Sequence, residues 1–270
     1  MRGASNIEKG GLKMVTEKEE SYSLKAFATS NDAFDRCRID MLIKNLRLRK
    51  KPCHGLEVGC GVAEALRRIN DTQQFSLLIG LDSSCVALKV ARKLSRRKVE
   101  YIRGDAQSLP FRNQLFDFVI AGEIIEHLQK GSTLVTEISR ILRPHGVFVL
   151  STPSGKKLSP DDISQGHVRL YYPCELEELL EKGGFSKIEI TKWGFVLLRL
   201  FFLLRKSILH QADLSRFISE GKEGTVRVVT QKGIFKLYRR LLPFITVILR
   251  FDLAPTEGTT KHIILRAVKS

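Results

Sequence analysis

From residue 55 onward, short apolar runs alternate with amphipathic stretches, and this alternation restricts the fold more than any other feature of the sequence. It predicts strand–helix–strand units with right-handed crossovers, and therefore a mostly parallel sheet with helices on both faces. Ser186–Trp193 is expected to form a sixth strand, and His262–Ala267 a last strand at the edge of the sheet. The first five strands are expected near 55–58, 76–81, 99–103, 116–121 and 147–151, with helices near 62–70, 84–97, 132–142 and 173–183.

The chain of 270 residues is long enough for one α/β domain with an extension, so we expect a single domain over residues 31–270. Residues 1–30 are polar and mixed in charge, and they lack the apolar run of a signal peptide. We therefore expect them to form a lead-in to the domain. An amphipathic helix is predicted at 32–46, ahead of the first strand.

Residues 194–258, between the last two predicted strands, are interpreted as a helical insertion. Two apolar segments within it, 195–210 and 234–251, also contain arginine and lysine. Neither segment reaches the roughly 20 uncharged residues of a membrane-spanning helix. The insertion is expected either to cover a substrate pocket as a lid or to lie on a membrane surface as an interfacial patch.

The chain is strongly basic, with a net charge of +16 and a pI near 9.8. Such a charge indicates attraction to anionic surfaces, either nucleic acid or phospholipid, although the helices of basic proteins also expose lysine and arginine without any partner. The five cysteines form no C-x-x-C pair and are odd in number. This favours reduced thiols in a cytoplasmic protein over a disulfide framework or a zinc site.

The run Leu-Glu-Val-Gly-Cys-Gly at 56–61 predicts a buried strand that breaks into a glycine turn before a helix. Gly59 and Gly61 let the backbone turn tightly and approach a ligand, and Cys60 between them is expected to be a small buried residue. Asp82 ends the next strand about 20 residues later, the spacing of an acid that accepts hydrogen bonds from ribose hydroxyls. The pattern predicts a ligand that contains adenosine, the alternative being a turn with only a structural role.

The residues after the turn favour one class of adenosine ligand. A dinucleotide site has a third glycine, whereas here Gly61 is followed by Val62, Ala63 and Glu64. The carboxylate of Glu64 in the first helical turn would repel a pyrophosphate. Glu57, in contrast, suits the ammonium group of a methionine tail. The sequence therefore favours S-adenosylmethionine over NAD.

Further motifs follow in order: GDAQSLPF at 104–111, FDFVI at 116–120, EIIEHL at 123–128, RILRPHG at 140–146 and STP at 151–153. Together with the glycine turn and Asp82, they resemble the class I S-adenosylmethionine-dependent methyltransferases, and specifically the type-11 and ubiquinone-pathway branch. The resemblance runs from about residue 30 to residue 193 and resumes near residue 262. It implies a Rossmann-like α/β fold with a mostly parallel seven-stranded sheet, in which the last strand is antiparallel.

The resemblance also implies roles for individual residues. The methionine end of the donor would be held by the glycine turn, and Asp82 with its neighbour Ser83 would meet the ribose. The adenine would contact the segment after the third strand, and the sulfonium side would lie near the end of the fourth. In this sequence these cofactor-binding positions are Glu57, Gly59, Cys60, Gly61, Asp82, Ser83, Asp105, Ala106 and Ala121.

The segment after the fourth strand contains the candidate catalytic residues. If it begins a helix, Glu123, Glu126 and His127 fall on one face, where they could bind Mg²⁺ or Mn²⁺. This E-x-x-E-H element resembles one found in ubiquinone-pathway O-methyltransferases and in small-RNA terminal 2′-O-methyltransferases, and His167 matches a further histidine of the metal-dependent RNA enzymes. Two alternatives remain: a metal-free site with His127 as general base oriented by Glu126, and polar residues that only cap a helix and fix the pocket wall.

The sequence thus predicts a cytoplasmic methyltransferase that acts on a small-molecule or lipid-like acceptor, at oxygen, and that contacts an anionic membrane peripherally. One alternative is an RNA methyltransferase of the metal-assisted 2′-O type, which the basic charge favours, although the sequence contains no appended RNA-binding module. A second alternative is a non-catalytic protein that binds S-adenosylmethionine. The oligomeric state stays open.

Overall fold

The computed structural model describes most of residues 33–194 and shorter parts of the remaining chain. The predicted lead-in and most of the predicted insertion lie outside the described residues. The described residues are 33–48, 53–71, 75–95, 99–194, 196–197, 199–200, 218–220, 226–228, 240–241, 244–256, 258 and 260–270.

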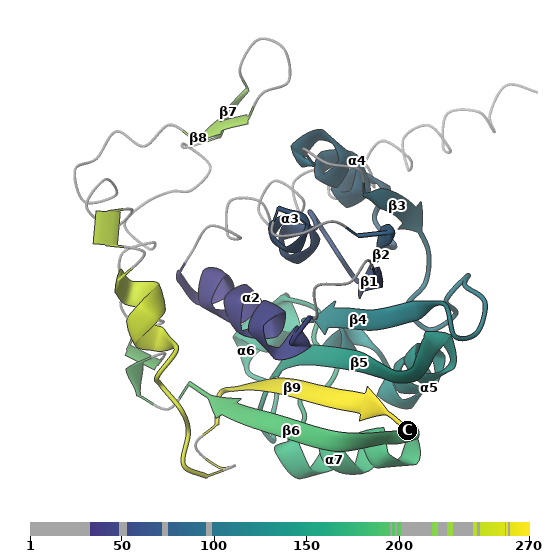
Figure 1. Ribbon diagram of the computed structural model, residues 1–270. Helices are drawn as coiled ribbons and strands as arrows, with labels where there is room; N and C mark the ends of the chain where they lie inside the picture. The colour runs from purple at the N-terminus through teal and green to yellow at the C-terminus, as the bar shows by residue number, and fades with distance from the viewer. Residues whose placement is uncertain are drawn as a thin grey trace, which may run out of the picture.

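A seven-stranded sheet forms the centre of the molecule, in the order β3-β2-β1-β4-β5-β9-β6 (Figure 1). All neighbouring strands from β3 to β5 pair in parallel, and β9 is antiparallel to both of its neighbours. The predicted Rossmann-like architecture is therefore confirmed. The strands are β1 (His54–Val58), β2 (Leu77–Asp82), β3 (Glu100–Arg103), β4 (Phe116–Gly122), β5 (Leu142–Pro153), β6 (Phe185–Trp193) and β9 (His262–Lys269).

The prediction that the last strand lies at the edge of the sheet was wrong. β9 is inserted between β5 and β6, and β6 forms the edge. The burial of the two strands agrees with this order, because six of the eight residues of β9 are buried whereas β6 exposes several of its side chains. A strand that is paired on both sides and covered on both faces is expected to be nearly all apolar, as His262–Ala267 is.

Helices cover both faces of the sheet and create two apolar cores (Figure 1). One core packs α2, α3 and α4 against the sheet, and the other packs α5 and α7 against the opposite face. The carboxyl ends of the parallel strands therefore form an edge of the sheet that lies between the first turns of these helices. The helices are α2 (Ala33–Leu46), α3 (Glu64–Asn70), α4 (Cys85–Leu94), α5 (Gly131–Ile141), the short α6 (Pro160–Ser164) and α7 (Pro173–Lys182).

Some boundaries differ from the predicted ones for local reasons. α3 begins at Glu64 rather than residue 62, because the preceding Gly61 and Ala63 both have positive φ angles. β5 begins at Leu142 rather than residue 147, since Leu142 already pairs with Phe116 before an irregularity in the register.

The described parts of the 194–258 segment contain both strands and helix. β7 (Ile218–Glu220) pairs with β8 (Val226–Val228), and residues 244–249 form a helix. Most of the apolar segment 195–210 lies outside the described residues. Within the part of the chain that is described, every helix is too short or too polar to cross a lipid bilayer.

Candidate functional site

In the turn after β1, one glycine packs closely against a side chain and another borders open space. Gly59, Gly61 and Ala63 have φ angles of 66°, 52° and 57°, the left-handed region that favours glycine. A Cβ on Gly59 would lie 2.5 Å from Ile124 Cδ1, whereas one on Gly61 would meet nothing within 4 Å. The backbone is therefore packed tightly at Gly59 and borders free space at Gly61.

Asp82 connects this turn to the next helix. Its Oδ2 accepts a hydrogen bond from the Gly61 N–H at 2.7 Å, and its Oδ1 accepts one from the Ser84 N–H at 2.8 Å. The contact arises because β1 and β2 pair in register, with Val58 opposite Leu81. Each carboxylate oxygen keeps a second lone pair, so Asp82 can still accept hydrogen bonds from two ribose hydroxyls.

Glu57 is buried beneath the turn and faces the start of α3. Its Oε2 accepts a hydrogen bond from the Leu66 N–H at 3.3 Å. Burial raises the pKa of Glu57 to about 8, so the side chain is mostly protonated at neutral pH in the free protein. A cation bound nearby would favour the ionised form. Burial also raises the pKa of the Cys60 thiol well above its usual value, which makes Cys60 an unreactive packing residue.

The other predicted cofactor-binding residues lie at the same edge of the sheet. Ser83 is exposed, and Asp105 is exposed in the loop after β3, where its Oδ1 accepts a hydrogen bond from the Gln107 N–H at 2.8 Å. Ala106 beside it is buried. Ala121 is fully buried in β4, opposite Val58 of β1. The adjoining Gly104 N–H donates to the Asp82 carbonyl at 3.1 Å, which holds the Asp105 loop close to Asp82.

Arg38 of α2 is a site residue that sequence reasoning missed. Its Nη1 donates to Ser151 Oγ at 3.1 Å, and its Nη2 pairs with Asp35 at 2.9 Å. A Cβ on Gly122, the last residue of β4, would lie 2.8 Å from Nη1. Although burial opposes it, the nearby Glu123 and Asp35 hold the pKa of Arg38 above its usual value. Arg38 is one of five charged residues in α2, so no signal in the sequence singled it out.

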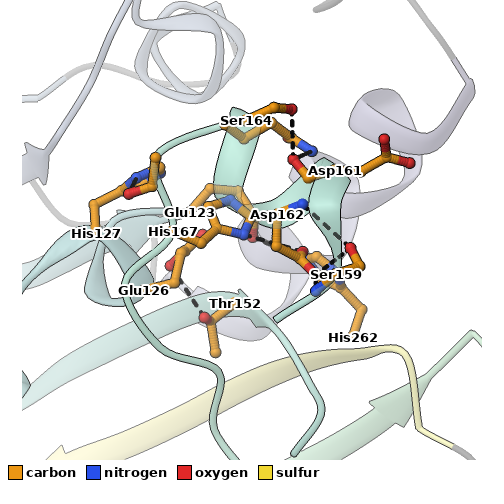
Figure 2. A network of polar contacts seen from close by, with 12 residues as sticks. Glu123, Glu126, His127, Thr152, Ser159, Asp161, Asp162, Ser164, His167 and His262 are labelled. Carbon is orange, nitrogen blue, oxygen red and sulfur yellow. Dashed lines mark hydrogen bonds and ion pairs between the residues drawn. The ribbon is translucent and has the colours of Figure 1, made fainter. Parts of the chain in front are cut away.

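Glu126 has one carboxyl oxygen without a partner. The side chain is fully buried in the short 3₁₀ turn Ile125–His127, and its Oε2 accepts a hydrogen bond from Thr152 Oγ1 at 3.0 Å (Figure 2). Its Oε1 is buried and makes no hydrogen bond. Burial, together with the nearby Glu123, raises the pKa of Glu126 well above its usual value. A buried acceptor without a partner is costly, so this oxygen is suited to a ligand.

His127 and His167 lie beside Glu126 with their rings 4.9 Å apart. His127 Nδ1 faces the Gly166 carbonyl at 3.1 Å, and His167 Nδ1 faces Asp162 Oδ1 at 3.2 Å (Figure 2). Because both Nδ1 atoms face acceptors, we assign the ring protons to Nδ1, which leaves Nε2 of each ring with a free lone pair. Burial lowers the pKa of His127, so this ring is neutral at neutral pH.

Glu123 is directed elsewhere. Its Oε1 accepts a hydrogen bond from Ser151 Oγ at 2.9 Å and lies 2.8 Å from His262 Nε2. Burial acts to raise the pKa of Glu123, but His262 and Arg38 outweigh it and lower that pKa to about 2. Of the four predicted metal ligands, the structure thus brings three together and pairs the fourth with His262. Sequence reasoning missed His262, the first residue of β9, whose ring contacts Glu123.

The cluster of Glu126, His127 and His167 has the composition of a metal site. One ligand atom from each residue lies within 4.8 Å of the others. The unpartnered Glu126 Oε1 supplies an oxygen ligand, and Asp162 orients His167 from behind as outer partners of metal-bound histidines do. One carboxylate and two imidazoles suit Mn²⁺ better than Mg²⁺, which prefers oxygen ligands alone. His127 Nδ1 lies against the Gly166 carbonyl rather than against Glu126.

Comparison with known proteins adds an independent result. Residues 56–150 match the family model of a methyltransferase domain. A probable S-adenosylmethionine-dependent methyltransferase of Mycolicibacterium smegmatis is 35% identical over 48% of this chain and 51% of its own length. An O-methyltransferase of Pyrenophora dematioidea is 32% identical over 53% of this chain and 58% of its own length. The chain spans about half the length of the curated relatives that it matches.

The fold is also found in solved structures. Phosphoethanolamine N-methyltransferase 2 of Haemonchus contortus, in complex with S-adenosyl-L-methionine, superposes with a TM-score of 0.61 at 20% identity. The match covers 86% of this chain and 52% of that one. Residues 56–150 therefore match a methyltransferase domain, within a fold that the chain shares with a solved S-adenosylmethionine-dependent methyltransferase.

Proposed function

We propose that this protein transfers a methyl group from S-adenosylmethionine to an oxygen atom of a small-molecule or lipid-like acceptor. The observation that carries the choice of oxygen is the cluster of Glu126, His127 and His167. An acceptor hydroxyl must lose a proton during methyl transfer. This cluster offers basic nitrogens and an unpartnered oxygen at the edge of the sheet where we expect the donor to bind.

Donor binding is assigned to the turn and its surroundings. Asp82 accepts the ribose hydroxyls, the Asp105–Ala106 loop meets the adenine edge, and the segment near Ala121 borders the sulfonium. Glu57 lies beneath the methionine end, where a bound ammonium group would favour its ionised form. The methionine tail also carries a carboxylate, which the acids of the turn cannot bind. Arg38 supplies the positive charge that this carboxylate needs.

The chemistry asks little of the protein beyond alignment. The sulfonium is already an activated leaving group, so the acceptor oxygen has only to lie in line with the methyl group in a site that excludes water. His127 and His167 each present an Nε2 that can take the acceptor proton. Their Nδ1 partners fix the orientation of both rings.

A divalent cation fits this site. Glu126, His127 and His167 would hold it, and we propose Mn²⁺, or Mg²⁺ with more water ligands. When bound, the cation would lower the pKa of the acceptor hydroxyl. Binding of Mn²⁺ by the free protein can be measured by electron paramagnetic resonance, and Glu126→Gln should weaken it while Glu181→Gln, on the exposed side of α7, should not.

The activity is tested with donor carrying a labelled methyl group, supplied with lipid extracts, polar metabolite extracts and RNA in separate reactions, each with Mn²⁺ and again with chelator. We expect label on an oxygen atom of a lipid or small molecule. Glu126→Gln should lower the rate roughly a hundredfold or more and leave calorimetric binding of S-adenosylhomocysteine unchanged. Label on RNA alone would support the 2′-O alternative instead. Donor binding without label in any fraction would support a non-catalytic binding protein.

We also propose a cytoplasmic location. Cys37, Cys53, Cys60 and Cys85 are free thiols, and all four are at least partly buried. Free thiols without any disulfide are usual in a reducing compartment. Fractionation of the source cells with an antibody would check this, and recovery of the protein with oxidised cysteines from an extracellular fraction would contradict it.

A further inference from the structure

The described residues 240–241 and 244–251 present several apolar side chains to the outside. Phe244 is 67% exposed and Phe251 is 78% exposed. Together with three aliphatic residues they follow helical spacing on one side of the segment, so their side chains form one continuous row. This row, called the outer stripe below, consists of Leu241, Phe244, Val247, Ile248 and Phe251.

The outer stripe faces away from the domain, because the opposite side of the helix packs against the domain. Leu249 is buried, and its carbonyl accepts a hydrogen bond from Trp193 Nε1 of β6 at 2.6 Å. Arg250 forms an ion pair with Asp40 of α2. Asp252, just beyond, accepts a hydrogen bond from the Val196 N–H at 2.9 Å. The helix thus has an apolar inner side and an apolar outer side, which is unusual for a surface helix.

The charge around the outer stripe indicates what kind of surface it meets. Arg240 is exposed at its start. The segment 194–258 as a whole contains eleven lysines and arginines against five aspartates and glutamates. An exposed apolar row within a basic segment has the chemistry of an interfacial helix, in which the apolar side chains enter the acyl boundary and the basic ones stay with lipid phosphates. Nucleic acid fits less well, because aliphatic side chains such as Val247 and Ile248 do not stack on bases.

We propose that the outer stripe docks this protein on the surface of an anionic lipid bilayer. Five exposed large apolar side chains on one segment, within a basic stretch of sequence, are typical of a membrane or partner contact rather than of free surface. The inference does not depend on the acceptor proposed above. If both hold, docking brings the edge of the sheet that carries the polar cluster toward acceptors dissolved in the membrane.

The first test is sedimentation of the full chain with vesicles. We expect binding to vesicles that contain phosphatidylglycerol and phosphatidylcholine, and little binding to phosphatidylcholine alone, with the difference reduced by salt. Phe244→Ser combined with Phe251→Ser should lower binding about tenfold or more. Ile163→Ser, which replaces an exposed apolar residue on α6, is the matched control and should not change it. Equal binding by the double variant and the unchanged chain would overturn the proposal.

A second measurement locates the contact directly. The chain has one tryptophan, Trp193, which is fully buried. In a Phe251→Trp variant, lipids brominated on the acyl chains should quench the added fluorescence and leave that of Trp193 unchanged. Absence of quenching would mean that another part of the chain covers the outer stripe, and would overturn the proposal. So would light scattering that showed a dimer of the unchanged chain and a monomer of the double serine variant, because the occupant would then be a second copy.

Discussion

At the scale of single residues, Glu57 shows how burial without a charged partner changes an acid. Its carboxyl group is enclosed beneath the glycine turn and accepts one backbone hydrogen bond. Between pH 5 and pH 8 the folded protein keeps the Glu57 proton, whereas the unfolded chain releases it near pH 4.5. The folded state then binds more protons than the unfolded state, so the free energy of unfolding falls as the pH rises through this window.

Glu57→Gln should therefore remove part of this pH dependence. Glutamine resembles the protonated acid, so the variant should match the unchanged protein near pH 5 and be more stable at pH 8 by roughly 2–4 kcal/mol. The measurement is urea unfolding at several pH values without donor. Glu181→Gln on α7 serves as the control. Parallel stability curves for the Glu57 variant and the unchanged protein would contradict the assignment.

Arg38 allows an equally specific test of its proposed role. Arg38→Met should weaken the binding of S-adenosylhomocysteine by roughly tenfold or more, because a charge-assisted contact to the carboxylate is lost. Binding of methylthioadenosine, which has no carboxylate, should be unchanged. Arg36→Met, an exposed arginine on the same helix, is the control for both ligands in calorimetry. Equal losses for both ligands would mean that Arg38 acts only through folding.

At the scale of elements, the turn after β1 contains two glycines, Gly59 and Gly61, that have similar φ angles and different surroundings. Gly59→Ala meets both the left-handed backbone and the Ile124 side chain, whereas Gly61→Ala meets only the backbone cost. Gly61→Ala should lower the free energy of unfolding by about 1–2 kcal/mol, and Gly59→Ala by more. Urea unfolding of both variants gives the comparison. A larger loss at Gly61 would show that the space beside it is not open in the free protein.

The elements also show what the sequence predicted well. The parallel strands and the helices α3, α4, α5 and α7 were located from local periodicity, because each buries one face within a short stretch of chain. The glycine turn and Asp82 belong to neighbouring units of this kind, and a hydrogen bond joins them in the structure. Their role in donor binding stays a prediction. Glu126, His127 and His167 were likewise brought together as expected.

The sequence predicted less where elements far apart in the chain meet. The place of β9 in the sheet depends on pairing with β5 and β6, which periodicity does not reveal. For the same reason, reading the sequence missed Arg38 from α2 and His262 from β9, both of which reach Glu123 or its partner Ser151 across the sheet. Glu123 was grouped with its sequence neighbours, but its contacts are set by these distant residues.

At the scale of the whole molecule, donor binding should stabilise the fold, because the proposed donor-binding residues come together only in the folded state. S-adenosylhomocysteine at about one hundred times its dissociation constant should add about 2.7 kcal/mol to the free energy of unfolding. The melting temperature should then rise by several degrees. Scanning fluorimetry measures this shift. Asp82→Asn should need more ligand for the same rise, because one acceptor for Gly61, Ser84 or the ribose is lost.

The insertion of β9 between β5 and β6 has a consequence for how the chain matures during synthesis. On the ribosome, six strands of the sheet emerge before β9. Until β9 is synthesised, the edges of β5 and β6 that pair with it have no partner strand. When His262–Lys269 pairs with both strands, it completes the sheet and also brings His262 into contact with Glu123. Assembly of the fold and completion of its polar network are thus a single late event, and a nascent chain halted before residue 262 would have neither.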